Sequence, residues 1–284
     1  MITRRIKEII SINLLRLLIS ISIMFLLLFL YLIFSKGIGV IDWTFLTQKP
    51  LKGMTEGGIF PAILGTMYLT VMSLVIAFPL GVMASVYLAE YGKPRWIMTV
   101  IRTAINTLAG VPSIVYGLFG LAIFVNMFNM GVSILSGSLT LAILILPIII
   151  NASEEAIKQV PSGFREAAFA LGATKRQVIM RVILPAALPN ILTGAIISVG
   201  RAAGETAPIL FTAATFYTGK LPQSVMDEVM ALPYHIYALM TEGTAPDKQV
   251  PIAYGTAVIL LLLVLGINTA AIIIRYRMRR TKQW

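Results

Sequence analysis

The sequence predicts an all-α membrane protein with about six transmembrane helices. Of its 284 residues, 58% are hydrophobic and only 12% are charged, whereas soluble domains carry roughly 25% charged residues. The apolar residues gather in six runs, and crossing about 30 Å of hydrocarbon takes roughly 20 helical residues. Because lipid offers no hydrogen-bond partner to the backbone, apolar runs of this length indicate helices.

The six predicted spans differ in length and flanking residues. The first could be taken for a secretory signal because basic residues precede it, but its apolar run is too long and no cleavage site follows, which predicts an uncleaved anchor. The fourth is short and contains Pro147, which a membrane helix tolerates when neighbouring helices satisfy the freed carbonyl. The spans cover residues 17–34, 63–89, 104–128, 138–152, 191–211 and 252–274.

Basic residues predict the orientation of the spans. The formal net charge is +11, and most Lys and Arg residues lie in alternate loops, which marks those loops as cytoplasmic. Both termini are therefore expected in the cytoplasm. We expect a cytoplasmic segment 1–16 and one transmembrane domain, 17–284, in contact with membrane lipid. Its parts are outer loops 35–62 and 212–251, a cytoplasmic loop 153–190 and a cytoplasmic tail 275–284. The basic residues flank apolar spans, so nucleic acid is not an expected partner.

Several kinds of site are not predicted. Cysteine is absent, which excludes disulfides and thiolate metal sites. His235, the only histidine, is interpreted as a surface or interface residue without a metal. The sequence contains no G-x-x-x-x-G-K-[ST] phosphate loop and no convincing set of nucleophile and base. We therefore expect neither a cofactor nor enzyme activity in this chain.

The loop between spans four and five is predicted to form two short helices at an elbow. Ser162 is placed to cap the first helix, and Gly172 to end it with positive φ. Thr174 followed by Gln177 is a capping box that opens the second helix. Pro185 and Pro189 are expected to close that helix before the next span. The exposed apolar face of the elbow fits either a groove on a protein partner or the lipid surface.

The same loop resembles the EAA loop of ABC importer permeases. The matching residues are Glu166-Ala167-Ala168, then Gly172, then Ile183-Leu184-Pro185. The resemblance implies a type I importer permease fold, in which this coupling helix docks into a separate ATP-hydrolysing subunit. ATP and Mg²⁺ would be bound by that partner. The residues expected to carry the coupling are Arg165, Glu166, Ala167, Ala168, Leu171, Gly172 and Thr174.

Longer stretches narrow the resemblance to phosphate ABC transporter permeases of the PstA type. They are GGIFPAILGT (57–66), PLGVMASVYLAEY (79–91), AGVPSIVYGLFG (109–120), RAAGETAPILFTA (201–213) and ALPYHIY (231–237). Asn190 departs from the pattern, since many relatives have glycine there. The resemblance implies partners: a homologous PstC-type permease chain, two ATP-binding subunits and a periplasmic or extracellular phosphate-binding protein. It also implies a bacterial or archaeal cytoplasmic membrane.

The fifth span contains two charged residues, Arg201 and Glu205. Arg201 lies ten residues after Ile191, about 15 Å along a helix and therefore near the middle of the membrane. Glu205 is four residues further, close enough for an ion pair. The pair either locks helices together or lines an anion path. The resemblance favours the path, with Arg201, Glu205 and Thr206 on it.

Other polar and small residues have less specific predictions. Gly110, Pro112, Gly117 and Gly120 are expected to interrupt or thin the third span, more for helix packing than for binding. Asn106 is expected to form a hydrogen bond between helices. The outer segment 225–240 is predicted to be an amphipathic interfacial or gate helix.

Three alternative functions stay open at this stage. An ABC importer of the same kind could carry another oxyanion, such as phosphonate, sulfate or molybdate. A secondary anion transporter would depend on an ion gradient and would leave the EAA loop unexplained. A structural membrane scaffold would need Arg201 for abundance and not for transport.

Overall fold

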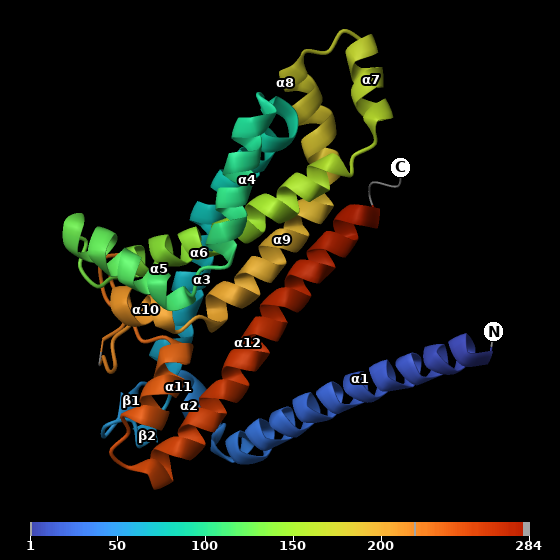
Figure 1. The fold of residues 1–284 in the computed structure, drawn as a ribbon. Helices are drawn as coiled ribbons and strands as arrows, with labels where there is room; N and C mark the ends of the chain where they lie inside the picture. The colour runs from blue at the N-terminus through green and yellow to red at the C-terminus, as the bar shows by residue number, and fades with distance from the viewer. Residues whose placement is uncertain (1, 219, 281–284) are drawn as a thin grey trace.

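The protein is an elongated bundle of helices (Figure 1). A computed structural model describes residues 2–218 and 220–280. Within these residues, five helices are long and apolar enough to cross a membrane, and a bent pair of helices adds a sixth candidate. The five are α1 (Ile2–Gly37), α3 (Phe60–Val86), α6 (Ile134–Lys158), α9 (Leu184–Gly204) and α12 (Pro246–Arg280). The prediction of about six spans is confirmed.

Shorter elements connect and cover the long helices. The short helices are α2 (Trp43–Thr47), α4 (Arg95–Ala109), α5 (Ser113–Gly120), α7 (Ser162–Ala170), α8 (Lys175–Val178), α10 (Ala207–Thr212) and α11 (Leu232–Thr241). One antiparallel hairpin pairs β1 (Pro50–Leu51) with β2 (Glu56–Gly57). A 3₁₀ turn occupies Ile38–Val40, and π-helical segments occupy Tyr87–Tyr91, Leu121–Met127 and Ile179–Ile183.

The core lies where α6 packs between α3 and α9. Small residues permit close approach: a Cβ added to Gly81 would collide with Ile149, and one added to Gly194 would collide with Ala152. Buried hydroxyls on α3 donate to carbonyls of their own helix, as Thr70 does to Thr66 at 2.7 Å. Small residues and internally satisfied hydroxyls are the usual means of packing helices in membranes.

The predicted fourth span, 138–152, is too short. Ser133 caps α6, because its hydroxyl accepts a hydrogen bond from the Ser136 amide at 3.2 Å, and the helix continues to Lys158. The polar residues at both ends of α6 are buried against other helices, as Ser136 and Glu154 are. An apolar run alone could not reveal ends whose polar side chains pack inside the protein.

The predicted third span, 104–128, is interrupted after Ala109, as its glycines and Pro112 predicted. α4 and α5 meet at an angle of 99°. Pro112 precedes α5 in extended conformation, and a proline disfavours helical geometry in the residue before it. Gly117 packs against the backbone of Ala207 on α10, and Gly120 packs against Thr140 on α6. The prediction of a packing role for these glycines is confirmed.

The predicted fifth span, 191–211, is wrong at both ends. Helical structure runs without a break from α8 through the π-helical segment into α9, so Pro185 and Pro189 do not close a separate helix. Pro185 lies just after the π-helical segment, in the first turn of α9. At the other end α9 stops at Gly204, Glu205 is extended, and α10 begins after it.

α1 lies apart from the bundle along most of its length (Figure 1). Its C-terminal end is attached to α12, where Gly37 lies against the backbone of Tyr254 and Lys36 sits over the Tyr254 ring at 5.2 Å. From Ile12 on, where the side chains are described, Leu27, Phe29 and most other apolar side chains of α1 are exposed. The predicted tail 275–284 continues α12 to Arg280, and its last four residues, 281–284, lie outside the described residues.

The hairpin, α2 and α11 gather at the end of the bundle opposite α7 and α8 (Figure 1). The prediction of one helix over 225–240 is wrong: residues 225–231 are irregular, Val229 forms an isolated bridge with Ala214, and α11 starts at Leu232. His235 is also not on the surface, since only 2% of it is exposed. α11 buries it against the core because Leu232 and Leu239 on the same helix belong to an apolar cluster.

Candidate functional site

Arg201 and Glu205 meet where α9 ends. Arg201 Nε donates to Glu205 Oε1 at 3.2 Å, as the spacing predicted. In the described part of the chain, no other hydrogen bond holds this guanidinium, and 33% of the arginine side chain is exposed against 16% of the glutamate. Guanidinium carries five N–H donors. Four of them are therefore open to a further acceptor.

The bend between α4 and α5 lies beside this pair. Tyr116 of α5 shares an apolar cluster with Ala202, the neighbour of Arg201. The Tyr116 hydroxyl of α5 donates to the Leu108 carbonyl of α4 at 2.7 Å, and this hydrogen bond joins the two helices across the bend. Two interrupted helices therefore meet at the charged pair, and interrupted helices at membrane depth are tolerated where they border protein or water.

The outer side of Glu205 is closed by packing. Glu205 borders a narrow crevice that has no room for a water molecule. The start of α11 covers this crevice through Ala231 and Pro233, and Ile209 of α10 completes the cover. Thr206 is half-buried at the start of α10 and makes no capping hydrogen bond there. In this conformation the side of Glu205 toward α11 is therefore closed to water.

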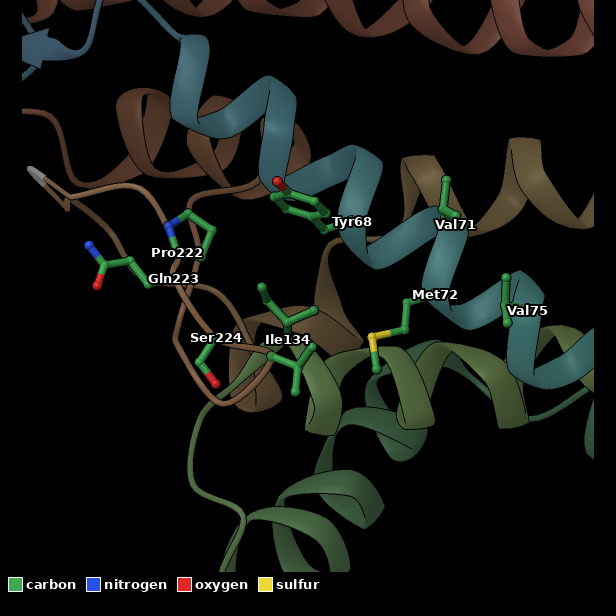
Figure 2. Close-up of a pocket in the computed structure, with 9 residues that line it drawn as sticks. Tyr68, Val71, Met72, Val75, Ile134, Pro222, Gln223 and Ser224 are labelled. Atoms are coloured by element: carbon green, nitrogen blue, oxygen red, sulfur yellow. The ribbon is translucent and has the colours of Figure 1, made fainter.

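A separate apolar groove lies between α3, the start of α6 and the loop 222–225. Figure 2 shows Tyr68, Met72 and Val75 along α3, with Met72 pointing toward α6, where Ile134 lies. The cavity volume is about 370 Å³, and no charged side chain lines it. An anion has no charge partner in this groove, so it is not the site for an oxyanion.

The elbow of α7 and α8 has the predicted local geometry. Gly172 has φ +79°, which favours glycine, and it ends α7 as expected. Thr174 and Gln177 form the capping box that opens α8. The prediction for Ser162 is wrong, because Pro161 occupies the N-cap and no side chain caps the helix.

The elbow presents part of its apolar face outward. Leu171 is 89% exposed, and Phe169, Glu166 and Ala167 are exposed beside it. Ala168 instead packs inward, against a buried cluster that includes Val178 and Ile179. The surface for a partner therefore centres on Leu171, and Ala168 belongs to the joint that supports it.

Arg165 does not point outward with the rest of the motif. Its guanidinium donates to Glu90 Oε1 from Nε at 3.2 Å and from Nη2 at 3.0 Å. It also donates to the Ile157 carbonyl at 2.9 Å and to the Val160 carbonyl. These contacts fasten α7 to the end of α3 and to the end of α6. Arg165 holds the elbow in place, while the exposed residues around Leu171 are left to meet a partner.

Sequence reasoning missed the residues that receive these contacts. Glu90 lies 75 residues before Arg165, and Tyr91 receives a second cation, Lys175, at 4.3 Å over its ring. Similarly, the buried Glu154 binds both Arg102 and Lys158, at 2.8 and 2.7 Å. The Glu154–Lys158 pair has the i,i+4 spacing of a helix, but the contacts of Arg102 with Glu154 and of Arg165 with Glu90 join distant residues and leave no local pattern.

Residues 77–282 match the family model for the binding-protein-dependent transport system inner membrane component. That match covers α6, the elbow, α9 and α12, which carry both the charged pair and the coupling loop. The chain belongs to this family. It is therefore a transport subunit, a permease of an ABC transporter, and a multi-pass membrane protein.

Curated relatives share about a third of the sequence over most of the chain. A probable ABC transporter permease protein, YqgI of Bacillus subtilis, is 35% identical and covers 86% of each chain. The phosphate transport system permease protein PstA 1 of Mycobacterium tuberculosis is 36% identical over 85% of this chain and 77% of its own. A probable PstA protein of Methanocaldococcus jannaschii is 36% identical over 83% and 82%.

Solved structures confirm the fold. An inward-facing form of the MetNI methionine ABC transporter matches with a TM-score of 0.60 at 21% identity, over 78% of this chain and 97% of the other. A bacterial ABC transporter for the import of alginate matches with a TM-score of 0.65 at 17% identity, over 99% and 100%. The chain has the fold of an ABC importer permease.

Proposed function

We propose that this chain is the membrane-spanning permease subunit of an ATP-driven importer that carries inorganic phosphate across the cytoplasmic membrane of a bacterium or archaeon. The observation that carries the proposal is the guanidinium of Arg201, held by one ion pair and otherwise open. The PstA relatives support phosphate as the substrate, since they are phosphate transport permeases by name.

The chemistry of the charged pair suits transient binding of an oxyanion. Guanidinium stays protonated and pairs with two phosphate oxygens at once. Glu205 holds Arg201 by a single contact while the path is empty. When phosphate replaces that contact, the carboxylate repels the anion onward, and release matters as much as capture in a transport path.

The proposed complex contains further chains. A homologous PstC-type permease would supply the other wall of the path. Two ATP-binding subunits would bind ATP and Mg²⁺ and receive the elbow around Leu171. A periplasmic or extracellular phosphate-binding protein would deliver phosphate to the outer loops. Both termini and the elbow would face the cytoplasm, as the basic loops predict.

Movement of the elbow would reach the path through α3 and α6. Arg165 ties α7 to Glu90 at the end of α3, and α3 packs on α6 along most of its length. ATP binding would draw the elbows of the two permeases together and open the outer side. When the complex returns to its starting conformation, Ala231 and Pro233 would again pack over the outer side of Glu205.

The test is phosphate-dependent ATP turnover by a reconstituted complex that contains this chain. We expect ATP hydrolysis to rise when phosphate and its binding protein are supplied, and labelled phosphate to enter the vesicles. Sulfate, molybdate and phosphonate serve as competitors. Uptake that follows one of these anions instead of phosphate, or uptake that persists without the ATPase, would overturn the proposal.

A further inference from the structure

Glu205 has a free carboxylate oxygen beside the open donors of Arg201. Its Oε1 accepts a hydrogen bond from Arg201 Nε at 3.2 Å. Across the described part of the chain, its Oε2 accepts no hydrogen bond. An ionised carboxylate accepts hydrogen bonds at both oxygens and has no donor of its own. The pair therefore places a set of free donors and a free acceptor side by side.

The surface next to this pair is open on one side. α9 ends at Gly204, and Glu205 follows it in extended conformation, with φ −74° and ψ 132°. Gly204 is exposed, and a Cβ added to it would meet no neighbouring atom. Arg201 lies three residues before Gly204, so the two are neighbours on the surface of the helix. Because Ala202 and Ala203 are buried, the open approach to the pair is on the Gly204 side of α9.

Oxyanions differ in whether they can serve a free acceptor. At neutral pH inorganic phosphate and arsenate carry one or two protons, whereas sulfate, molybdate and monofluorophosphate carry none. A protonated anion can present two bare oxygens to a guanidinium and donate its O–H to a carboxylate. An anion without a proton leaves the carboxylate unpaired and is only repelled by it. An arginine beside a free carboxylate oxygen therefore favours an oxyanion that keeps a proton.

Partial exposure of the carboxylate sets the size of this preference. Sites that bind a hydroxyl of their substrate reject an analogue without it by about 10⁴-fold, because buried polar groups are left unpaired. The Glu205 side chain is 16% exposed. Water can therefore replace part of the lost hydrogen bond, and we expect a smaller preference, about ten-fold.

We propose that Glu205 is a specificity residue: its free Oε2 accepts the O–H of the transported anion while Arg201 binds the unprotonated oxygens. The selected class is the tetrahedral oxyanions that keep a proton at neutral pH. This inference rests on the proposed phosphate transport and adds a physical reason for accepting phosphate and refusing sulfate. The hydrogen bond offsets only part of the repulsion between the carboxylate and the anion, so release inward is preserved.

A cysteine at Gly204 provides the test, because it reports anion binding at the pair itself. The chain has no cysteine of its own, and position 204 has room for a side chain and no positive φ. A small neutral thiol reagent should label Gly204→Cys in the reconstituted complex, and bound anions should slow the labelling. The binding protein is omitted, so that only the permease selects among the anions.

The expected result is protection that depends on the proton of the anion. Phosphate and arsenate should protect Gly204→Cys at about ten-fold lower concentration than monofluorophosphate or sulfate. Ser224→Cys, exposed in the outer loop, is the control, and no anion should change its labelling. Equal protection by all four anions, no protection by any of them, or no labelling of Gly204→Cys in any nucleotide state would overturn the inference.

Variants of Glu205 in the Gly204→Cys chain then assign the preference to this residue. Glu205→Gln replaces an oxygen that only accepts with an amide that also donates. Phosphate and monofluorophosphate should then protect at concentrations within about two-fold of each other. Glu205→Asp keeps the carboxylate and should keep part of the preference. A preference for phosphate that is unchanged in Glu205→Gln would contradict the proposed role.

The proposed function has a separate readout. If the unmodified complex moves no labelled phosphate, that proposal fails, whichever anions protect position 204. If the complex moves phosphate and Glu205→Gln keeps the full preference, only the inference about Glu205 fails. If Glu205→Gln does not assemble, the comparison of phosphate with monofluorophosphate in Glu205→Asp decides the question, and equal protection by the two anions contradicts the inference.

Discussion

Two arginine–glutamate pairs in this chain have the same chemistry and different surroundings. At the elbow, Arg165 binds Glu90 and also two backbone carbonyls, Ile157 and Val160, and its side chain is 22% exposed. Near the middle of the bundle, Arg201 binds Glu205 through Nε alone and is 33% exposed. The first guanidinium donates four hydrogen bonds, while the second donates one.

This difference separates a structural contact from a binding site. A guanidinium that donates to several neighbouring acceptors at once holds those neighbours in place, and removing it leaves the acceptors without donors. A guanidinium with one contact can exchange that contact for a ligand. The comparison therefore predicts that losing Arg201 stops transport while the fold remains. Losing Arg165 should instead weaken the attachment of α7 to α3 and α6, through which ATP hydrolysis is coupled to transport.

The largest effect is expected for Arg201→Gln. We expect phosphate uptake to fall at least a hundred-fold, because glutamine cannot supply a fixed charge or bind two phosphate oxygens together. The amount of assembled complex should match the wild type, since the lost ion pair is a single, partly exposed contact. Uptake of labelled phosphate into vesicles, beside the yield of purified complex, measures both quantities.

Two outcomes of that experiment would contradict the assignment of Arg201 as a binding residue and Arg165 as a structural one. Normal uptake by Arg201→Gln would remove the arginine from the path. Loss of assembled complex with normal transport per complex would make the pair a structural lock, as Arg165 is. Arg201→Lys is the matched control, because it keeps the charge and loses the forked geometry, and it should retain part of the uptake.

Arg165→Met should have the next largest effect. It leaves Glu90 and two carbonyls without their donor, and breaking a largely buried pair costs about 3 kcal/mol. We expect a lower thermal midpoint and ATP hydrolysis that no longer drives uptake, because α7 is released from α3. Glu90→Gln keeps a hydrogen-bond acceptor and should have a smaller effect in both assays. Full coupling in Arg165→Met would show that the elbow does not act through Glu90.

Gly172→Val tests the elbow without touching either ion pair. The residue has φ +79°, and a Cβ there would meet no neighbouring atom, so the substitution acts through the backbone alone. A β-branched residue in this conformation costs about 1–2 kcal/mol. We expect weaker docking of the ATPase, measured by its co-purification. Gly172→Asn tolerates the same conformation and should dock normally; equal loss in both variants would contradict the elbow geometry.

Local chemistry explains which parts of this structure could be predicted. The capping box of Thr174 and Gln177, the positive φ of Gly172 and the Arg201–Glu205 spacing depend on residues within four positions of each other, and all three are confirmed. The long apolar helices also follow directly from composition.

Predictions that depended on distant packing failed or were not made. An interruption of the third span at Gly110 and Pro112 was expected, but the 99° angle between α4 and α5 was not, and there α5 packs against α10 and α6. The ends of α6 lie in polar residues that become buried, and Glu90 reaches Arg165 across 75 residues. The same holds for His235, which was interpreted as a surface or interface residue and which the fold buries.

His235 gives the smallest expected effect. Burial lowers the pKa of this histidine in the outer loop to about 4, and among the described residues neither ring nitrogen has a hydrogen-bond partner. Because the folded pKa lies below that of the unfolded chain, its stabilising effect is complete above about pH 6.5 and declines as the pH falls toward 4. The free energy of unfolding of the wild type should fall by about 0.7 kcal/mol between pH 7 and pH 6 because of this group.

His235→Leu should lack that part of the acid sensitivity and transport normally at pH 7, since His235 touches neither charged pair. Thermal midpoints of both proteins across this pH range measure the difference, and identical pH profiles would mean that the ring has access to water in the assembled complex.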